Sequence, residues 1–159
     1  MRSALTSRQV NSMRGFTLIE LLAVLAIMAA LMAMTLPMAE ITVRREREAE
    51  LKHALWEIRD AIDAYKHMAD AGMLQHAPAS GYPPDLQTLV AGVQTNTAAV
   101  AYFMRQVPQD PFAAPAEGGG WALRSYRSPP ESPQAGADVF DVHSRSTEVG
   151  LNGIPLAQW

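Results

Sequence analysis

The apolar residues near the N-terminus of this chain form one long, nearly unbroken run. From Phe16 to Ala39 the sequence contains a single charged residue, Glu20. At ~1.5 Å per residue, this run makes about 36 Å of helix, which is enough to cross a lipid bilayer. We therefore predict a transmembrane helix over residues 16–39.

Beyond Ala39 the pattern changes from uniformly apolar to amphipathic. Apolar residues recur every three or four positions, as on one face of a helix, at Leu51, Leu55, Ile58, Ile62 and Tyr65. Gly72 is a natural end for this helix. Two pairs of opposite charge lie four residues apart and are expected to form ion pairs on its exposed side, namely Arg44 with Glu48 and Arg59 with Asp63.

The remaining sequence predicts short elements separated by turns. Asp85 is placed to cap a short helix over residues 86–91. Further predicted elements are a short helix over 98–106, strands over 121–127 and 139–143, a loop over 128–137 and a turn at Asn152-Gly153. The predicted fold class is α+β, with a long N-terminal helix packed on a small antiparallel sheet. Four regions result: a leader (1–15), an apolar helix (16–39), its amphipathic continuation (40–72) and a head domain (73–159).

Composition and charge exclude several functions. The chain has 13 Lys plus Arg against 16 Asp plus Glu, so it lacks the basic surface that binding to nucleic acid requires. The absence of cysteine excludes disulfides and thiolate chemistry. The four histidines have no metal-ligand spacing, and the serines and glycines form no nucleophile or phosphate-binding motif. We expect no enzymatic activity.

The first 20 residues carry the most informative motif. The segment before Phe16 contains three arginines and no acid, as in a targeting leader. Its end, Arg14-Gly15-Phe16-Thr17-Leu18-Ile19-Glu20, together with the apolar run and Pro37, resembles the class III signal and first helix of type IV pilins and pseudopilins. The resemblance implies that a prepilin peptidase cuts between Gly15 and Phe16 and methylates the new N-terminus on Phe16.

Glu20 is the physical peculiarity of the apolar run. A carboxylate at membrane depth costs on the order of 3 kcal/mol and normally needs a partner. The resemblance implies that this partner is the N-terminal amine of Phe16 in a neighbouring subunit, which makes Glu20 an assembly residue. Pro37 removes one backbone hydrogen bond, so a kink or local melting of the helix is expected there.

Three segments of the head resemble the major pseudopilin of type II secretion systems. They are Gly81-Tyr82-Pro83-Pro84, Val107-Pro108-Gln109-Asp110-Pro111-Phe112 and Val139-Phe140-Asp141-Val142-His143-Ser144. The resemblance implies a structural subunit of a filament that drives protein export. It also implies a single-pass protein of the bacterial inner membrane with a periplasmic C-terminal domain. The implied partners are further copies of the chain, other pseudopilins, the prepilin peptidase and the inner-membrane platform of the secretion machine.

The chain departs from that family in the loop after the last predicted strand, which in the family binds calcium. Calcium takes six to eight oxygen ligands, usually including several carboxylates. Here the loop itself has one carboxylate, that of Glu148, and Arg145 opposes a cation. The candidate calcium residues are Asp141, Ser144, Ser146, Glu148 and Asn152. We expect no cofactor; without calcium, packing of Leu151, Ile154 and Trp159 is expected to hold the loop.

Other interpretations stay open at this stage. A type IV pilus subunit for adhesion, motility or DNA uptake has the same first helix, although many such pilins carry a cysteine pair that this chain lacks. A membrane-anchored periplasmic binding domain that never polymerises is possible in a different class. An ordinary secretory signal peptide with cleavage near Ala39 fits less well, because such apolar segments are typically ~7 to 15 residues long and lack a carboxylate.

Overall fold

The computed structural model describes residues 16–113 and 120–159, and for residues 34–39 it describes the backbone alone. The predicted leader, residues 1–15, lies outside the described residues. The chain divides into two compact units, Met1–Thr42 and Val43–Trp159, called here the N-terminal unit and the C-terminal unit.

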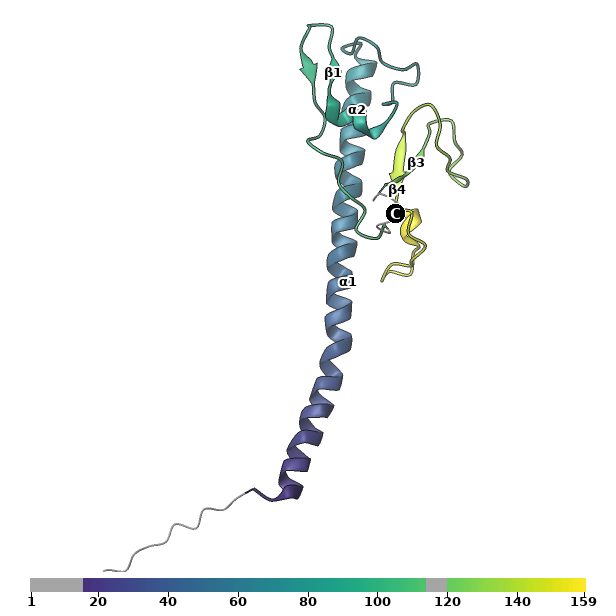
Figure 1. The fold of residues 1–159 in the computed structure, drawn as a ribbon. Helices are drawn as coiled ribbons and strands as arrows, with labels where there is room; N and C mark the ends of the chain where they lie inside the picture. The colour runs from purple at the N-terminus through teal and green to yellow at the C-terminus, as the bar shows by residue number, and fades with distance from the viewer. Residues whose placement is uncertain (1–15, 114–119) are drawn as a thin grey trace, which may run out of the picture. The chain divides into compact units, whose positions relative to one another are not determined.

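One long helix, α1, runs from Leu18 to Asp70 (Figure 1). It begins after Thr17, whose hydroxyl oxygen accepts a hydrogen bond from the Glu20 N–H at 3.3 Å and so satisfies one free amide of the first turn. The helix is continuous through Pro37, so the proline does not end it, and local melting of the helix there is not seen. A bend at Pro37 stays a prediction.

The end of α1 follows the sequence closely. Gly72 has a φ of 65°, a conformation that favours glycine. The Met73 N–H donates to the Met68 carbonyl and the Gly72 N–H to the Ala69 carbonyl, both at 3.0 Å. These two bonds are the pattern by which a left-handed glycine closes a helix. The predicted stop at Gly72 is confirmed.

The short helix α2, Leu86–Ala91, also has the predicted bounds. The Asp85 side chain accepts hydrogen bonds from the Thr88 N–H at 2.7 Å and from the Thr88 hydroxyl at 2.9 Å. Leu89 is the fully buried residue of α2. The cap and the single apolar anchor therefore fix this helix on the core.

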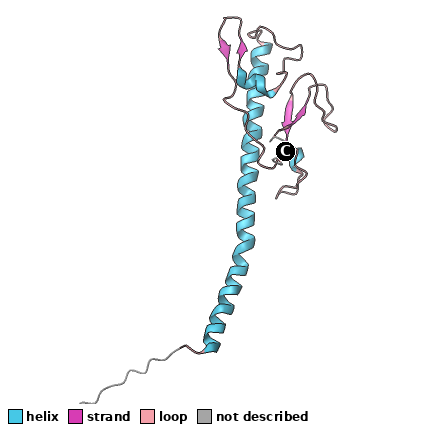
Figure 2. Ribbon diagram, viewed as in Figure 1, coloured by secondary structure: helices cyan, strands magenta, loops and turns pink. Residues whose placement is uncertain are grey.

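The strands form two separate antiparallel pairs rather than one sheet, as Figure 2 shows. Strand β1, Val93–Gln94, pairs with β2, Val100–Ala101. Strand β3, Ala122–Arg124, pairs with β4, Asp141–His143, with Leu123 opposite Val142. A last short 3-10 helix, η2, covers Leu156–Gln158. The predicted α+β class is confirmed, while the single sheet is corrected to two small pairs.

The helix predicted over residues 98–106 is wrong. This region contains β2, which returns to β1 through a turn that begins at Thr95. The Thr95 N–H and hydroxyl both donate to the Ala99 carbonyl, at 2.8 and 2.9 Å, and Ala98 has a φ of 60°. Threonine side chains compete with helical hydrogen bonds in this way, so the local turn replaces the expected helix.

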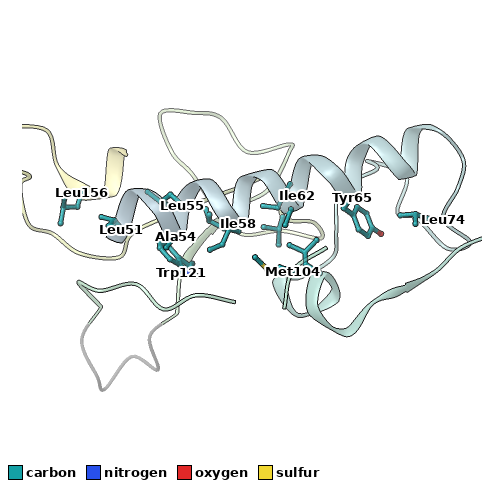
Figure 3. Packing of buried hydrophobic residues seen from close by; sticks show 14 residues of the cluster. Leu51, Ala54, Leu55, Ile58, Ile62, Tyr65, Leu74, Met104, Trp121 and Leu156 are labelled. Carbon is teal, nitrogen blue, oxygen red and sulfur yellow. The ribbon is translucent and has the colours of Figure 1, made fainter. Parts of the chain in front are cut away.

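The core of the C-terminal unit lies along one face of α1 (Figure 3). The five predicted apolar residues of that face are at most 1% exposed. Residues distant in sequence complete the cluster, among them Leu74, Leu89, Met104, Trp121, Val139, Val142 and Leu156. Fully burying one large apolar side chain contributes about 1.5–3 kcal/mol, so the five residues of this face contribute strongly to the stability of the unit.

Candidate processing and assembly site

Of the two residues at the predicted cleavage point, the structure describes Phe16 alone. Gly15 lies outside the described residues, and Phe16 is 84% exposed. Glu20 lies in the first turn of α1 and is also exposed. Within the part of the chain that the structure describes, Phe16 and Glu20 are accessible to other molecules.

Thr17 is a residue of this site that sequence reasoning missed. Its contact with the Glu20 N–H, described above, starts α1 immediately after Phe16. The signal was present in the spacing, because threonine followed three residues later by glutamate is a common start of a helix. Glu20 is therefore the third residue of α1, and its N–H takes part in the start of the helix, besides the predicted role of its side chain in assembly.

The apolar side chains that the structure describes over residues 18–33 of α1 are exposed. Those of Leu18, Ile19, Leu22, Leu25 and Leu31 are between 54% and 78% exposed. A solvent-exposed apolar surface of this extent marks a site of contact with protein or membrane. The helix thus requires an environment that other molecules supply.

No helix in the part of the chain that the structure describes has a stretch both long and apolar enough to span a membrane. The segment predicted to do so, residues 16–39, includes the six residues whose side chains are not described. The transmembrane prediction therefore stays a prediction.

Of the three head segments that resemble the major pseudopilin, residues 139–144 contact the other two. The Val139 N–H donates to the Pro83 carbonyl at 2.8 Å. The Ser144 hydroxyl donates to the Asp110 carboxylate at 2.6 Å, and both residues are buried. Asp110 also accepts from the Phe112 N–H at 2.8 Å. Residues 139–144 thereby link two segments that lie far apart in the sequence within the C-terminal unit.

Two charged side chains of α1, Arg44 and Glu48, bind the loop after β4. The predicted pair of Arg44 and Glu48 is present, with Nε and Oε1 3.6 Å apart. Arg44 Nη2 donates to the Val149 carbonyl at 2.6 Å, and the largely buried Glu48 carboxylate accepts from the Leu151 N–H at 2.7 Å. Arg44 therefore binds a carbonyl of the loop backbone, and Glu48 binds an N–H group of it.

Arg59 makes a second attachment, different from the predicted one. Its Nε donates to Asp141 Oδ1 at 2.8 Å, and its Nη2 donates to the main-chain oxygens of Val142 and Trp159 at 3.0 and 2.8 Å. Asp63 was the predicted partner, and no ion pair between it and Arg59 is found among the described residues. The arginine thus ties strand β4 and Trp159, the residue after η2, to α1.

The candidate calcium residues are engaged separately. Asp141 faces Arg59, and Glu148 Oε2 lies 3.3 Å from Arg44 Nη2. The Ser144 hydroxyl accepts from the Ser146 N–H, the Ser146 hydroxyl from the Glu148 N–H, and the Asn152 side chain from the Ile154 N–H. Within the described ranges no three His, Asp or Glu side chains are grouped as metal ligands would be. The donor set does not fit a calcium ion.

Packing in the terminal loop also differs from expectation. Trp159 is partly buried against the core, as predicted, but Leu151 and Ile154 are 47% and 46% exposed. Leu156, which sequence reasoning did not single out, is fully buried. The loop is therefore anchored by Leu156, Trp159 and the two arginines.

Burial changes the proton affinity of His143, which lies on β4. Burial lowers the pKa of His143, and the positive charges of Arg59 and Arg124 lower it further, while Asp141 acts in the opposite direction. The neutral imidazole is thus favoured in the folded chain.

Comparison with known proteins gives one match, and it falls on the N-terminal site. Residues 10–36 match the prokaryotic N-terminal methylation motif. This match includes Gly15, Phe16 and Glu20, and it supports a prepilin-like protein of the type IV pilin class that is processed by a prepilin peptidase and assembles with pilin-type subunits. Neither a search of curated proteins nor a search of solved structures found a match.

Proposed function

We propose that this chain is a structural subunit of a type II secretion pseudopilus. The observation that carries the proposal is the methylation motif over residues 10–36, which includes the first part of α1, where the described apolar side chains are exposed. A chain of this kind is processed at its N-terminus and then buries its first helix among other subunits. It acts by assembly and catalyses no reaction.

The precursor is anchored in the bacterial inner membrane by residues 16–39, with the C-terminal unit in the periplasm. The prepilin peptidase cuts between Gly15 and Phe16 and methylates the Phe16 amine. That amine, with a pKa of roughly 8, carries a positive charge near neutral pH and keeps it when methylated. It is therefore available as a partner for the Glu20 carboxylate of a neighbouring subunit.

This pairing explains why a carboxylate occurs in the apolar helix. An isolated subunit has an unpaired charge in the membrane, whereas an assembled subunit has a paired one. Glu20 thus favours one register of neighbouring helices. The same step requires other copies of the chain or other pseudopilins as partners, with the secretion platform of the inner membrane as the site of assembly.

The head supports a pseudopilus rather than a pilus. Residues 139–144 contact the other two segments that resemble the major pseudopilin, through Asp110 with Ser144 and Pro83 with Val139. The absence of cysteine points the same way, because many pilins close their C-terminal region with a disulfide.

A deletion strain tests this function. Loss of the chain is expected to stop release of exported enzymes into the medium and to leave them in the periplasm, while surface pili and twitching stay normal. Restoring the intact gene, but not one with Phe16 to Ala39 replaced by a cleavable secretory signal, is expected to restore export. Normal export together with lost pili would replace the pseudopilus with a type IV pilus. Normal export with normal pili would favour a tethered domain.

A further inference from the structure

Charged groups of α1 contact the loop after β4 at one place and the residues on either side of it at another. In the C-terminal unit, Arg44 and Glu48 contact residues 148–151, and Arg59 contacts β4 and Trp159. The attached segment is the one in which the resembling family places a calcium ion. A calcium ion gathers oxygen atoms around itself. The oxygens around Arg44 and Arg59 can be compared with such a set.

Each arginine gathers three oxygens from different parts of the chain. Around Arg44 lie the Val149 carbonyl at 2.6 Å, Glu148 Oε2 at 3.3 Å and Glu48 Oε1 at 3.6 Å. A guanidinium has five N–H donors in a rigid plane, so it can hold several oxygens at once. The positive charge stands next to two carboxylates and a carbonyl, as a metal ion would.

Arg59 forms the more complete set. Asp141 Oδ1, the Val142 carbonyl and the Trp159 main-chain oxygen lie 2.8 to 3.0 Å from its nitrogens. The side chain is 32% exposed and that of Asp141 is 29% exposed, so the pair is sheltered from water on most sides. Sheltered hydrogen bonds to a charged group are stronger than those at a free surface.

Among the described residues, the same contacts already engage the groups that a divalent ion would use. Calcium would compete with Arg59 for the Asp141 carboxylate and with Arg44 for that of Glu148, while the Ser144 and Asn152 oxygens already accept from the N–H groups of Ser146 and Ile154. Arg44 and Arg59 would then be close to an added double positive charge, and like charges at such distances repel strongly. The chain would thus give up charged contacts for a site with two carboxylates, whereas calcium takes six to eight oxygen ligands.

We propose that the side chains of Arg44 and Arg59 do in this chain what a bound calcium ion does in the resembling family, so that its C-terminal loop is fastened without a metal. The head then keeps its form in surroundings where calcium is scarce. The proposal concerns the loop alone and is independent of processing at Gly15 and of the machine in which the chain works.

Hydrogen exchange of backbone amides, read by mass spectrometry on the full chain in detergent, tests this directly. The peptides of interest cover residues 145–159, where the Leu151 N–H is bonded to Glu48 and the Leu156 N–H to the Glu148 carbonyl. Wild type is expected to exchange at the same rate with excess calcium and with excess chelator. Arg44→Gln and Arg59→Gln are each expected to speed exchange in these peptides by about tenfold or more, because loop groups lose their partner.

Matched controls come from the same helix. Arg45 and Arg47 are exposed neighbours of Arg44, so Arg45→Gln and Arg47→Gln are expected to leave the exchange of residues 145–159 unchanged. Peptides that cover Leu55 to Ile62 report whether the core of a variant stays folded. Should one arginine variant lose protection throughout, the other arginine variant tests the guanidinium contacts, and the calcium and chelator comparison on wild type tests the metal.

Two results would overturn the proposal. Slower exchange of residues 145–159 in wild type on addition of calcium would show that a metal fastens the loop. Unchanged exchange in both arginine variants, with the core intact, would show that the guanidinium contacts do not hold it.

Discussion

The two parts of α1 are continuous in backbone and opposite in environment. In the N-terminal unit, the described apolar side chains of residues 18–33 are exposed, and in the C-terminal unit a single apolar face is buried completely. The difference follows from sequence: uniform apolarity has no polar face to leave in water, whereas a three-and-four repeat has one. The apolar side chains in the second part of α1 are therefore buried by the chain's own head. Those in the first part have to be buried by a membrane or by other subunits.

A carboxylate in the exposed part should be the most sensitive point of assembly. Glu20→Leu is expected to abolish incorporation into filaments while insertion into the membrane is equal or better, because a charge is removed from the apolar segment. Crosslinking between subunits and membrane fractionation measure the two effects. Glu40→Leu, the same change beyond the apolar run, is the control and should assemble. Normal assembly of Glu20→Leu would remove the proposed role of this residue.

The same substitution at two places on α1 separates the environments of its parts. Leu55 is 1% exposed and Leu22 is 56% exposed. Leu55→Ala is expected to lower the free energy of unfolding of the C-terminal unit by about 2–5 kcal/mol through a cavity. Leu22→Ala should change it by at most about 0.5 kcal/mol. Chemical denaturation of the full chain in detergent, followed by tryptophan fluorescence, gives both values, and equal losses would contradict the contrast.

The junction of the head segments is expected to contribute less than the apolar face. Asp110→Asn should cost about 1–3 kcal/mol, because the buried Ser144 hydroxyl loses a charged acceptor. Asp85→Asn is a matched control on the helix cap, where asparagine serves about as well as aspartate. The same denaturation measurement compares them. A loss at Asp85 as large as that at Asp110 would argue against a special junction.

The smallest effect concerns acid. Because the pKa of His143 is lowered in the folded chain, the unfolded chain binds more protons as the pH falls below about 6.5, and acid therefore lowers stability. The contribution is fully present above that pH. His143→Gln should show a smaller drop in the unfolding midpoint between about pH 7 and pH 5 than wild type. An identical drop in both would mean that other groups cause the acid sensitivity.

Local patterns predicted the parts of this molecule that depend on near neighbours. The buried face of α1, its stop at Gly72 and the cap of α2 each follow from residues a few positions apart. The turn at Thr95 was missed because its threonine side chain competes with a helix, a local effect that apolar spacing does not reveal.

Contacts across long stretches of chain were not predictable from the sequence. Arg59 pairs with Asp141, 82 residues away, although Asp63 lies at helical spacing. Leu156 joins the core, while the similarly apolar Leu151 and Ile154 stay about half exposed. Which of several equivalent side chains is used depends on how the loop folds back, and spacing along the chain carries no information about that.

The central claim is that the chain is processed like a prepilin at its N-terminus and that assembly with other subunits then buries the apolar side chains of the N-terminal unit. Intact-mass and N-terminal analysis of the protein recovered from membranes, in cells with and without the prepilin peptidase, tests it most directly. The account predicts loss of residues 1–15 and one added methyl group on Phe16, both only when the peptidase is present. An intact Met1 in both strains, or a cut near Ala39, would contradict the account and leave an anchored or a secreted domain.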